Sequence, residues 1–143
     1  MTMKVLVVEP HKTPYVKDID HGLASLQREV RGCIEAVYPF DDDVCIICNE
    51  DGKLLKMDMN RALRDEDGNV CDIIAGTFLI VGLGEDEFID LTPEQQYKYA
   101  TMFETPEVFE FCNDRWEAYL ATEFSDEYEK TIEQFFDDDE IEI

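Results

Sequence analysis

The residues best placed to do chemistry are carboxylates, and they are concentrated in the segment EVFEFCNDRWE at residues 107–117. Read as a helix, with 100° between successive residues, this segment places Glu107, Glu110, Asp114 and Glu117 along one side. The opposite side carries an apolar set: Phe109, Cys112, Trp116, Tyr119 and Leu120. Because the apolar side must pack against the rest of the protein, we expect the acidic stripe to face outward.

The predicted partner-binding residues continue beyond this stripe towards the C-terminus. They include Glu123, Asp126, Glu127, Asp137, Asp138 and Asp139. Like charges at helical spacings repel, and few lysines are present to compensate, so the arrangement lowers stability. Acids about 5–6 Å apart along a helix also approximate the spacing of phosphates along a nucleic-acid strand. The pattern predicts binding to a basic nucleic-acid-binding surface of another protein, and the alternative is a solvated helix face.

The overall charge supports a basic partner. The 143 residues contain 35 acids and 12 Lys and Arg, a formal net charge of −23. Residues 85–143 hold 20 of these acids and only three bases, a net of −17. Such a balance argues against direct binding to nucleic acid or to an anionic membrane, and favours a basic partner, a cation or simple solubility.

Metal and redox chemistry are poorly supported by the residue spacing. Cys45 and Cys48 have C-x-x-C spacing, but within a strand these positions face opposite sides, so we interpret them as small core residues. Neither Gly52 nor Gly68 is the sixth residue of a loop with the ligands of an EF-hand. A looser cation site at residues 41–43 or in the tail is the alternative. We expect no cofactor and no metal.

Catalytic motifs are also weak. There is no G-x-S-x-G elbow and no phosphate-binding glycine loop, and the only histidines are His11 and His21. We therefore expect a protein that is not an enzyme, with a small metal-dependent enzyme as an alternative.

Strand-like segments dominate the first part of the chain, at residues 4–9, 15–19, 33–40, 44–50 and 71–83. One helix is expected after Asp20, with Gly32 at its C-terminal end. Further helices are expected to start near Thr92, Thr105 and Ser125. The predicted fold class is α+β: a small mixed or antiparallel sheet with one N-terminal helix, then an acidic helical C-terminal part. The predicted division is 1–84 for the sheet core and 85–143 for the helical extension with a short acidic tail, packed as one domain.

The location is expected to be cytoplasmic. No targeting segment or membrane span is recognisable, and five scattered cysteines suit a reducing compartment.

Several polar and glycine positions carry a resemblance to a known family: Gly32, Glu35, Gly52, Asn60, Arg61, Gly76 and Gly82. Over residues 3–84 the chain resembles an uncharacterised domain-of-unknown-function family of short proteins encoded mainly by phages, plasmids and conjugative elements. The resemblance brings no enzyme activity, but it implies an accessory gene of a mobile element and a bacterial host cell. Within this pattern we interpret Asn60 as a turn-capping residue and Arg61 as satisfying nearby carboxylates or carbonyls, in preference to a partner contact.

Charge and resemblance together predict an inhibitor of a host defence nuclease, such as an anti-CRISPR or anti-restriction protein. It would act as an acidic nucleic-acid mimic on a Cas effector or a restriction enzyme. The alternative is a non-enzymatic accessory module that binds a basic regulatory protein.

Overall fold

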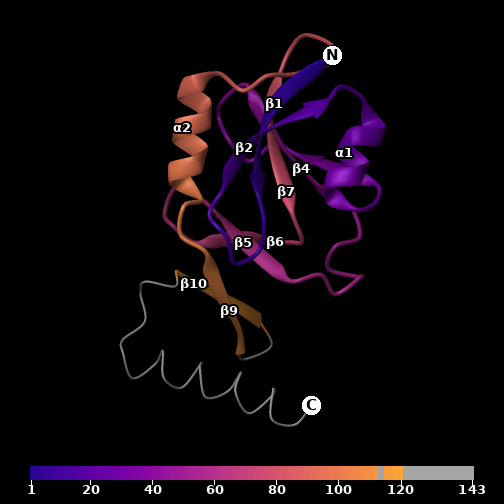
Figure 1. Cartoon of the computed structure of the whole chain (residues 1–143). Helices are drawn as coiled ribbons and strands as arrows, with labels where there is room; N and C mark the ends of the chain where they lie inside the picture. Colours follow the sequence, from indigo (N-terminus) through magenta and orange to yellow (C-terminus); the bar gives the residue numbers. More distant parts are fainter. Residues whose placement is uncertain (113–114, 121–143) are drawn as a thin grey trace.

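A central antiparallel sheet organises the protein, as the computed structural model in Figure 1 shows. The structure describes the backbone of residues 1–112 and 115–120, and the side chains of residues 1–109. The sheet has the order β2-β1-β7-β4-β3, and β8 pairs with the end of β7. Its strands are β1 (Thr2–Val8), β2 (Tyr15–Asp20), β3 (Ile34–Val37), β4 (Val44–Asn49), β7 (Phe78–Leu83) and β8 (Phe88–Ile89).

Two further antiparallel pairs and two short helices complete the described chain. The pairs are β5 (Met59–Arg64) with β6 (Val70–Ala75), and β9 (Glu107–Cys112) with β10 (Arg115–Leu120). The helices are α1 (Leu23–Val30) and α2 (Pro93–Met102). Within the described part of the chain, neither helix is long and apolar enough to cross a membrane.

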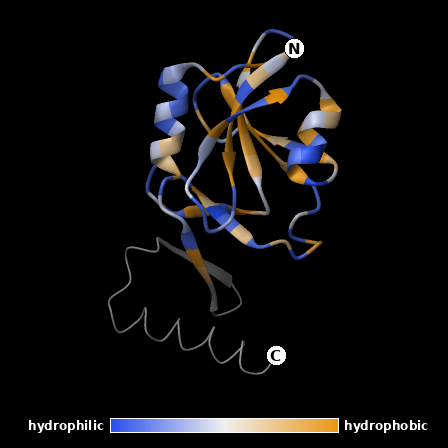
Figure 2. Cartoon of the chain, viewed as in Figure 1, coloured by the Kyte–Doolittle hydropathy of each residue, from blue (hydrophilic) through white to orange (hydrophobic). Residues whose placement is uncertain are grey.

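The central strands β4 and β7 are buried on both faces, which explains why they are almost continuously apolar (Figure 2). Side chains alternate between the faces and form two separate core clusters. The face covered by α1 carries Val5, Val7, Cys45, Ile47, Leu79 and Val81. The other face, covered by α2 and the β5–β6 pair, carries Leu6, Val8, Val44, Ile46, Phe78 and Ile80.

Helix α2 begins where the sequence predicts. Thr92 Oγ1 accepts a hydrogen bond from the Gln95 backbone N–H at 3.1 Å, and Gln95 Oε1 accepts one from the Thr92 N–H at 3.0 Å. This capping box satisfies two backbone donors that the helix itself leaves free. Three residues from this part of the chain, Leu91, Tyr99 and Phe103, lie in the core beneath α2.

The predicted α+β fold class is wrong, because the described chain is mainly antiparallel β-structure with two short helices. Helix α1 does lie in the stretch predicted as helical, but it is only eight residues long and sits between strands. Its left-handed C-terminal residue is Arg31, with φ 63°, in the place predicted for Gly32. The predicted acidic helix at residues 107–120 is instead the β9–β10 hairpin.

The residue types in 107–120 explain why this segment forms a hairpin. Its two segments are rich in β-branched and aromatic residues, which favour strands, including Val108, Phe109 and Trp116. Asn113 and Asp114 lie between the strands in the sequence, and both residue types favour turns. The helix predicted from Ser125 lies outside the described residues.

Candidate partner-binding surface

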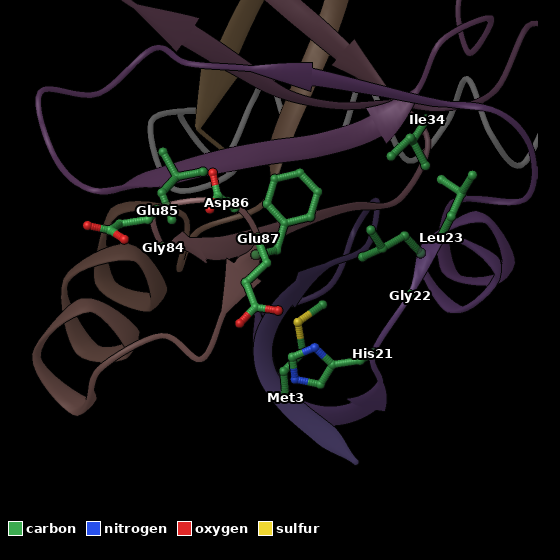
Figure 3. A pocket seen from close by; sticks show the side chains of 12 residues that line it. Met3, His21, Gly22, Leu23, Ile34, Gly84, Glu85, Asp86 and Glu87 are labelled. Atoms are coloured by element: carbon green, nitrogen blue, oxygen red, sulfur yellow. The ribbon is translucent and has the colours of Figure 1, made fainter.

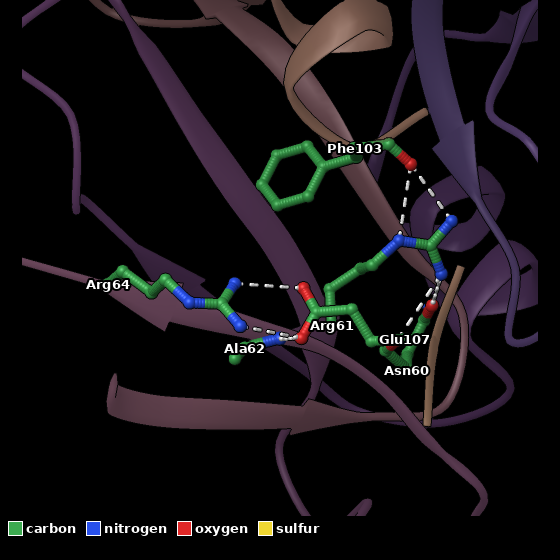
Figure 4. Close-up of polar contacts among 6 residues, drawn as sticks. All are labelled: Asn60, Arg61, Ala62, Arg64, Phe103 and Glu107. Atoms are coloured by element: carbon green, nitrogen blue, oxygen red, sulfur yellow. Dashed lines mark hydrogen bonds and ion pairs between the residues drawn. The ribbon is translucent and has the colours of Figure 1, made fainter. Parts of the chain in front are cut away.

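Glu107, the first residue of the predicted stripe, lies in the interior at the start of β9. It is 3% exposed, and its carboxylate accepts a hydrogen bond from the Ala62 backbone N–H at 3.3 Å. Arg64 donates from Nη1 to Oε1 at 3.1 Å and from Nη2 to Oε2 at 3.3 Å (Figure 4). The prediction that Glu107 faces outward is therefore wrong, because a strand places it against β5 and not on a helix surface.

The hairpin register replaces the predicted stripe with a different relationship. Glu110 and Glu117 are directly opposite each other across β9 and β10, whereas Glu107 is opposite Leu120. The register thus pairs Glu110 with Glu117 and gives Glu107 a different partner. The other predicted binding residues lie outside the described residues: Asp114, Glu123, Asp126, Glu127, Asp137, Asp138 and Asp139.

Arg61 is fully buried in β5 and bonds to backbone carbonyls. Its Nε and Nη2 donate to the Phe103 carbonyl at 3.2 and 2.9 Å (Figure 4). Nη2 also donates to the Lys12 carbonyl at 2.7 Å. Nη1 donates to Asn60 Oδ1 at 2.8 Å. Burial lowers the pKa of Arg61, and the negative charge of Glu107 opposes that shift. These contacts fit the interpretation of Arg61 as a residue that satisfies carbonyls.

Asn60 extends the same buried network to the end of the central sheet. Its Nδ2 donates to the Val8 carbonyl at 2.8 Å and to the Gly76 carbonyl at 2.9 Å. Asn60 lies in strand β5, so the predicted turn-capping role is wrong. Together, Asn60 and Arg61 join β1, the β1–β2 loop, β5, the β6–β7 connection and the end of α2.

Three acidic triplets lie in connections between strands: residues 41–43, 65–67 and 85–87. Within the first, Asp42 accepts a hydrogen bond from the Tyr99 hydroxyl at 2.7 Å, which lowers the pKa of Asp42. Lys98 Nζ lies 3.7 Å from the same carboxylate. Asp42 therefore holds α2 in place, while residues 65–67 and 85–87 are exposed and form no ion pair within the described residues.

The C-x-x-C cysteines lie on opposite faces of the sheet, as predicted. Cys45 belongs to the cluster beneath α1 and Cys48 to the cluster on the other face. Burial raises the pKa of each thiol to about 11. In residues 1–112 and 115–120, no group of three or more His, Cys, Asp or Glu side chains is placed to hold a metal ion.

The fold and its surface define a small antiparallel β protein with a helix on each face and a carboxylate-rich exterior. A family model described as "Domain of unknown function (DUF3846)" matches residues 3–104. The chain belongs to this family. The match extends past the predicted limit of residue 84 and includes β8 and α2. No curated protein and no solved structure matches the chain.

Proposed function

We propose that the protein is a mobile-element inhibitor of a host defence nuclease, such as a Cas effector or a restriction enzyme. It acts in the bacterial cytoplasm as an acidic nucleic-acid mimic and performs no catalysis. The observation that carries the proposal is the charge: a net of −23, of which −17 falls on residues 85–143. An excess of this size attracts a basic surface and repels nucleic acid itself.

The hairpin register supports mimicry in a new form. Residues directly opposite each other in an antiparallel pair have Cα atoms about 4.5–5.5 Å apart, close to the spacing of about 5–6 Å between acids along a helix. Glu110 and Glu117 hold this relationship in the β9–β10 hairpin. Like charges directly opposite each other destabilise a strand pair. The pairing of Glu110 with Glu117 therefore lowers the stability of the hairpin, and a surface that only contacts water does not need this pairing.

Inhibition assays on purified nucleases test this proposal. Capture of the target should weaken as salt rises and should be competed by duplex DNA, because the protein and the DNA bind the same basic surface of the nuclease. The double variant Glu110→Gln, Glu117→Gln should inhibit less than the parent. A second variant neutralises six of the ten acids beyond residue 120: Glu123, Asp126, Glu127, Asp137, Asp138 and Asp139.

The matched control is Glu50→Gln, Glu66→Gln, which removes the same charge as the hairpin variant from exposed positions outside residues 85–143. It should inhibit as well as the parent. The proposal would be contradicted if the hairpin variant and the variant changed beyond residue 120 both inhibited as fully as the parent. Binding of the parent to DNA at moderate salt would also contradict it.

The alternative is a non-enzymatic accessory module that binds a basic regulatory protein. Its contact would use exposed apolar side chains such as Leu54 and Tyr97, at 80% and 77% exposure, in addition to charge. Capture of a basic protein that duplex DNA fails to compete would select this alternative.

A further inference from the structure

Helix α1 is too short to cover its face of the sheet. Beyond its N-terminal end lies a pocket of about 630 Å³ between α1, the start of β3 and the β7–β8 turn (Figure 3). The apolar side chains that line it are Met3, Leu23, Leu26, Ile34, Leu83 and Phe88. A pocket of this size is within the range typical of ligand sites.

The floor of this pocket is continuous with the core beneath α1. Met3 and Leu26 are buried members of that core, and Ile34, Leu83 and Phe88 are partly buried against it. Leu23, at the first position of α1, is 56% exposed. The pocket therefore offers apolar surface that the described chain leaves open to water.

The rim of the pocket is acidic. Glu85, Asp86 and Glu87 are exposed in the turn that joins β7 to β8, where the Gly84 N–H donates to the Glu87 carbonyl at 2.8 Å. His21 lines the pocket from the end of β2, and Figure 3 shows Glu87 extending towards the side where His21 and Met3 lie. No Lys or Arg is among the described residues that line it, so the rim carries three carboxylates and the imidazole of His21.

We infer that this pocket binds a segment of a partner protein in which a bulky apolar side chain is flanked by Lys or Arg. The apolar floor accepts the side chain, and the three carboxylates attract the flanking cations. The inference adds a binding site to the proposed function. It rests on the proposed function only in taking the partner to be a basic protein.

Charge argues against the two occupants that the protein itself could supply. Residues 121–143 contain ten acids and one lysine, and a second copy of the chain carries a net charge of −23. Either would bring further negative charge to a rim that is already acidic.

The test uses the full-length protein and a short synthetic peptide with two adjacent leucines between pairs of lysines. Backbone amide NMR of the labelled protein should show shifts confined to residues 3, 21–26, 34 and 83–88. One control peptide replaces the leucines with serine and keeps the lysines, and a second replaces the lysines with glutamate and keeps the leucines. Neither control should shift these amides.

Two protein variants separate the pocket from general charge attraction. Glu85→Gln, Asp86→Asn, Glu87→Gln should weaken peptide binding at least about tenfold. The matched control, Glu50→Gln, Glu66→Gln, Asp67→Asn, removes equal charge from exposed positions away from the pocket and should bind nearly as well as the parent. Leu23→Ser tests the apolar contribution at a position exposed enough to leave the fold intact, and it should also weaken binding.

Four results would overturn the inference: no shifts with the leucine–lysine peptide, equal binding of the serine control, equal weakening in the two triple variants, or occupation of the pocket by this chain. Nuclear Overhauser contacts from the pocket to residues 121–143 would reveal that the chain's own segment occupies it. Pocket shifts that depend on protein concentration without peptide would reveal a second copy. Because this assay contains no nuclease, its failure and the failure of the proposed inhibition are distinguishable.

Discussion

Glu107 and Arg64 form a two-contact ion pair that joins β9 to the end of β5, with N–O distances of 3.1 and 3.3 Å. Glu107 is 3% exposed, and the Arg64 side chain is 32% exposed. The same carboxylate accepts the Ala62 backbone N–H, so one acid fixes the first residue of the hairpin to the neighbouring strand. Glu107 therefore positions the acidic hairpin on the core.

Replacing Glu107 with glutamine should destabilise the protein by about 1–3 kcal/mol, because the charge-assisted contacts to Arg64 are lost in a buried setting. Urea unfolding measures the change. Glu104→Gln is the matched control: it removes the same charge three residues earlier at an exposed position and should change stability by less than about 0.5 kcal/mol. Equal stability of the two variants would show that the ion pair contributes nothing.

Arg61 should tolerate replacement even less well. Arg61→Met leaves the Phe103 and Lys12 carbonyls without their buried donor, and an unsatisfied buried group costs about 1–3 kcal/mol. Arg61→Lys should also unfold at lower urea concentration than the parent, since an ammonium cannot reproduce the planar set of donors. The exposed Arg28→Lys serves as control. A lysine variant as stable as the parent would contradict the role assigned to the guanidinium.

Local sequence signals predicted the elements that depend on local contacts. The start of α2 followed from Thr92, Pro93 and Gln95, because a capping box is made within one turn of helix. The strand at residues 44–50 followed from its apolar, β-branched composition.

The hairpin at residues 107–120 could not be predicted in this way. Its apolar residues Phe109, Cys112 and Trp116 also fit helical spacing, so this short segment is compatible with the period of a helix and with that of a strand. The contacts that favour the strand come from Ala62 and Arg64, more than forty residues earlier. For the same reason no local signal identified Glu107 as a buried acid.

Tyr99 and Asp42 should give the protein a measurable pH dependence. The hydrogen bond from Tyr99 lowers the pKa of Asp42, and burial together with Asp42 raises the pKa of Tyr99. The contribution of Asp42 to the free energy of unfolding is present above the ordinary carboxyl pKa of 3.8. It is lost as pH falls through the lower pKa of Asp42 in the folded protein. The contribution of Tyr99 to the free energy of unfolding is present below pH 10.0, the ordinary pKa of tyrosine. It is lost as pH rises towards the higher pKa of Tyr99 in the folded protein.

Tyr99→Phe should therefore flatten both limbs of the stability profile, measured by urea unfolding across the pH range. It should also lower stability near neutrality by about 1 kcal/mol for the lost hydrogen bond. Tyr97→Phe, at a position 77% exposed, should leave the profile unchanged. Indistinguishable profiles for the parent and Tyr99→Phe would mean that the pair does not couple folding to protons.

Purified under reducing conditions, the protein should contain no stoichiometric zinc. Cys45 and Cys48 lie in separate core clusters on opposite faces of β4, so they cannot chelate one ion together. Elemental analysis measures the metal content. One zinc per chain, lost together with folding in Cys45→Ser or Cys48→Ser, would overturn this prediction.

The four cysteines whose side chains the structure describes should divide sharply in their reaction with iodoacetamide. The thiolate is the reactive form, and burial raises the pKa of Cys45 and Cys48 to about 11, whereas Cys33 and Cys71 are exposed. At pH 8 in native buffer, peptide mass spectrometry should find Cys33 and Cys71 modified and the two β4 cysteines unmodified. All four should react in urea, which controls for peptide recovery. Modification of Cys45 at the same rate as Cys33 in the folded protein would mean that the sheet opens far more readily than its two buried faces indicate.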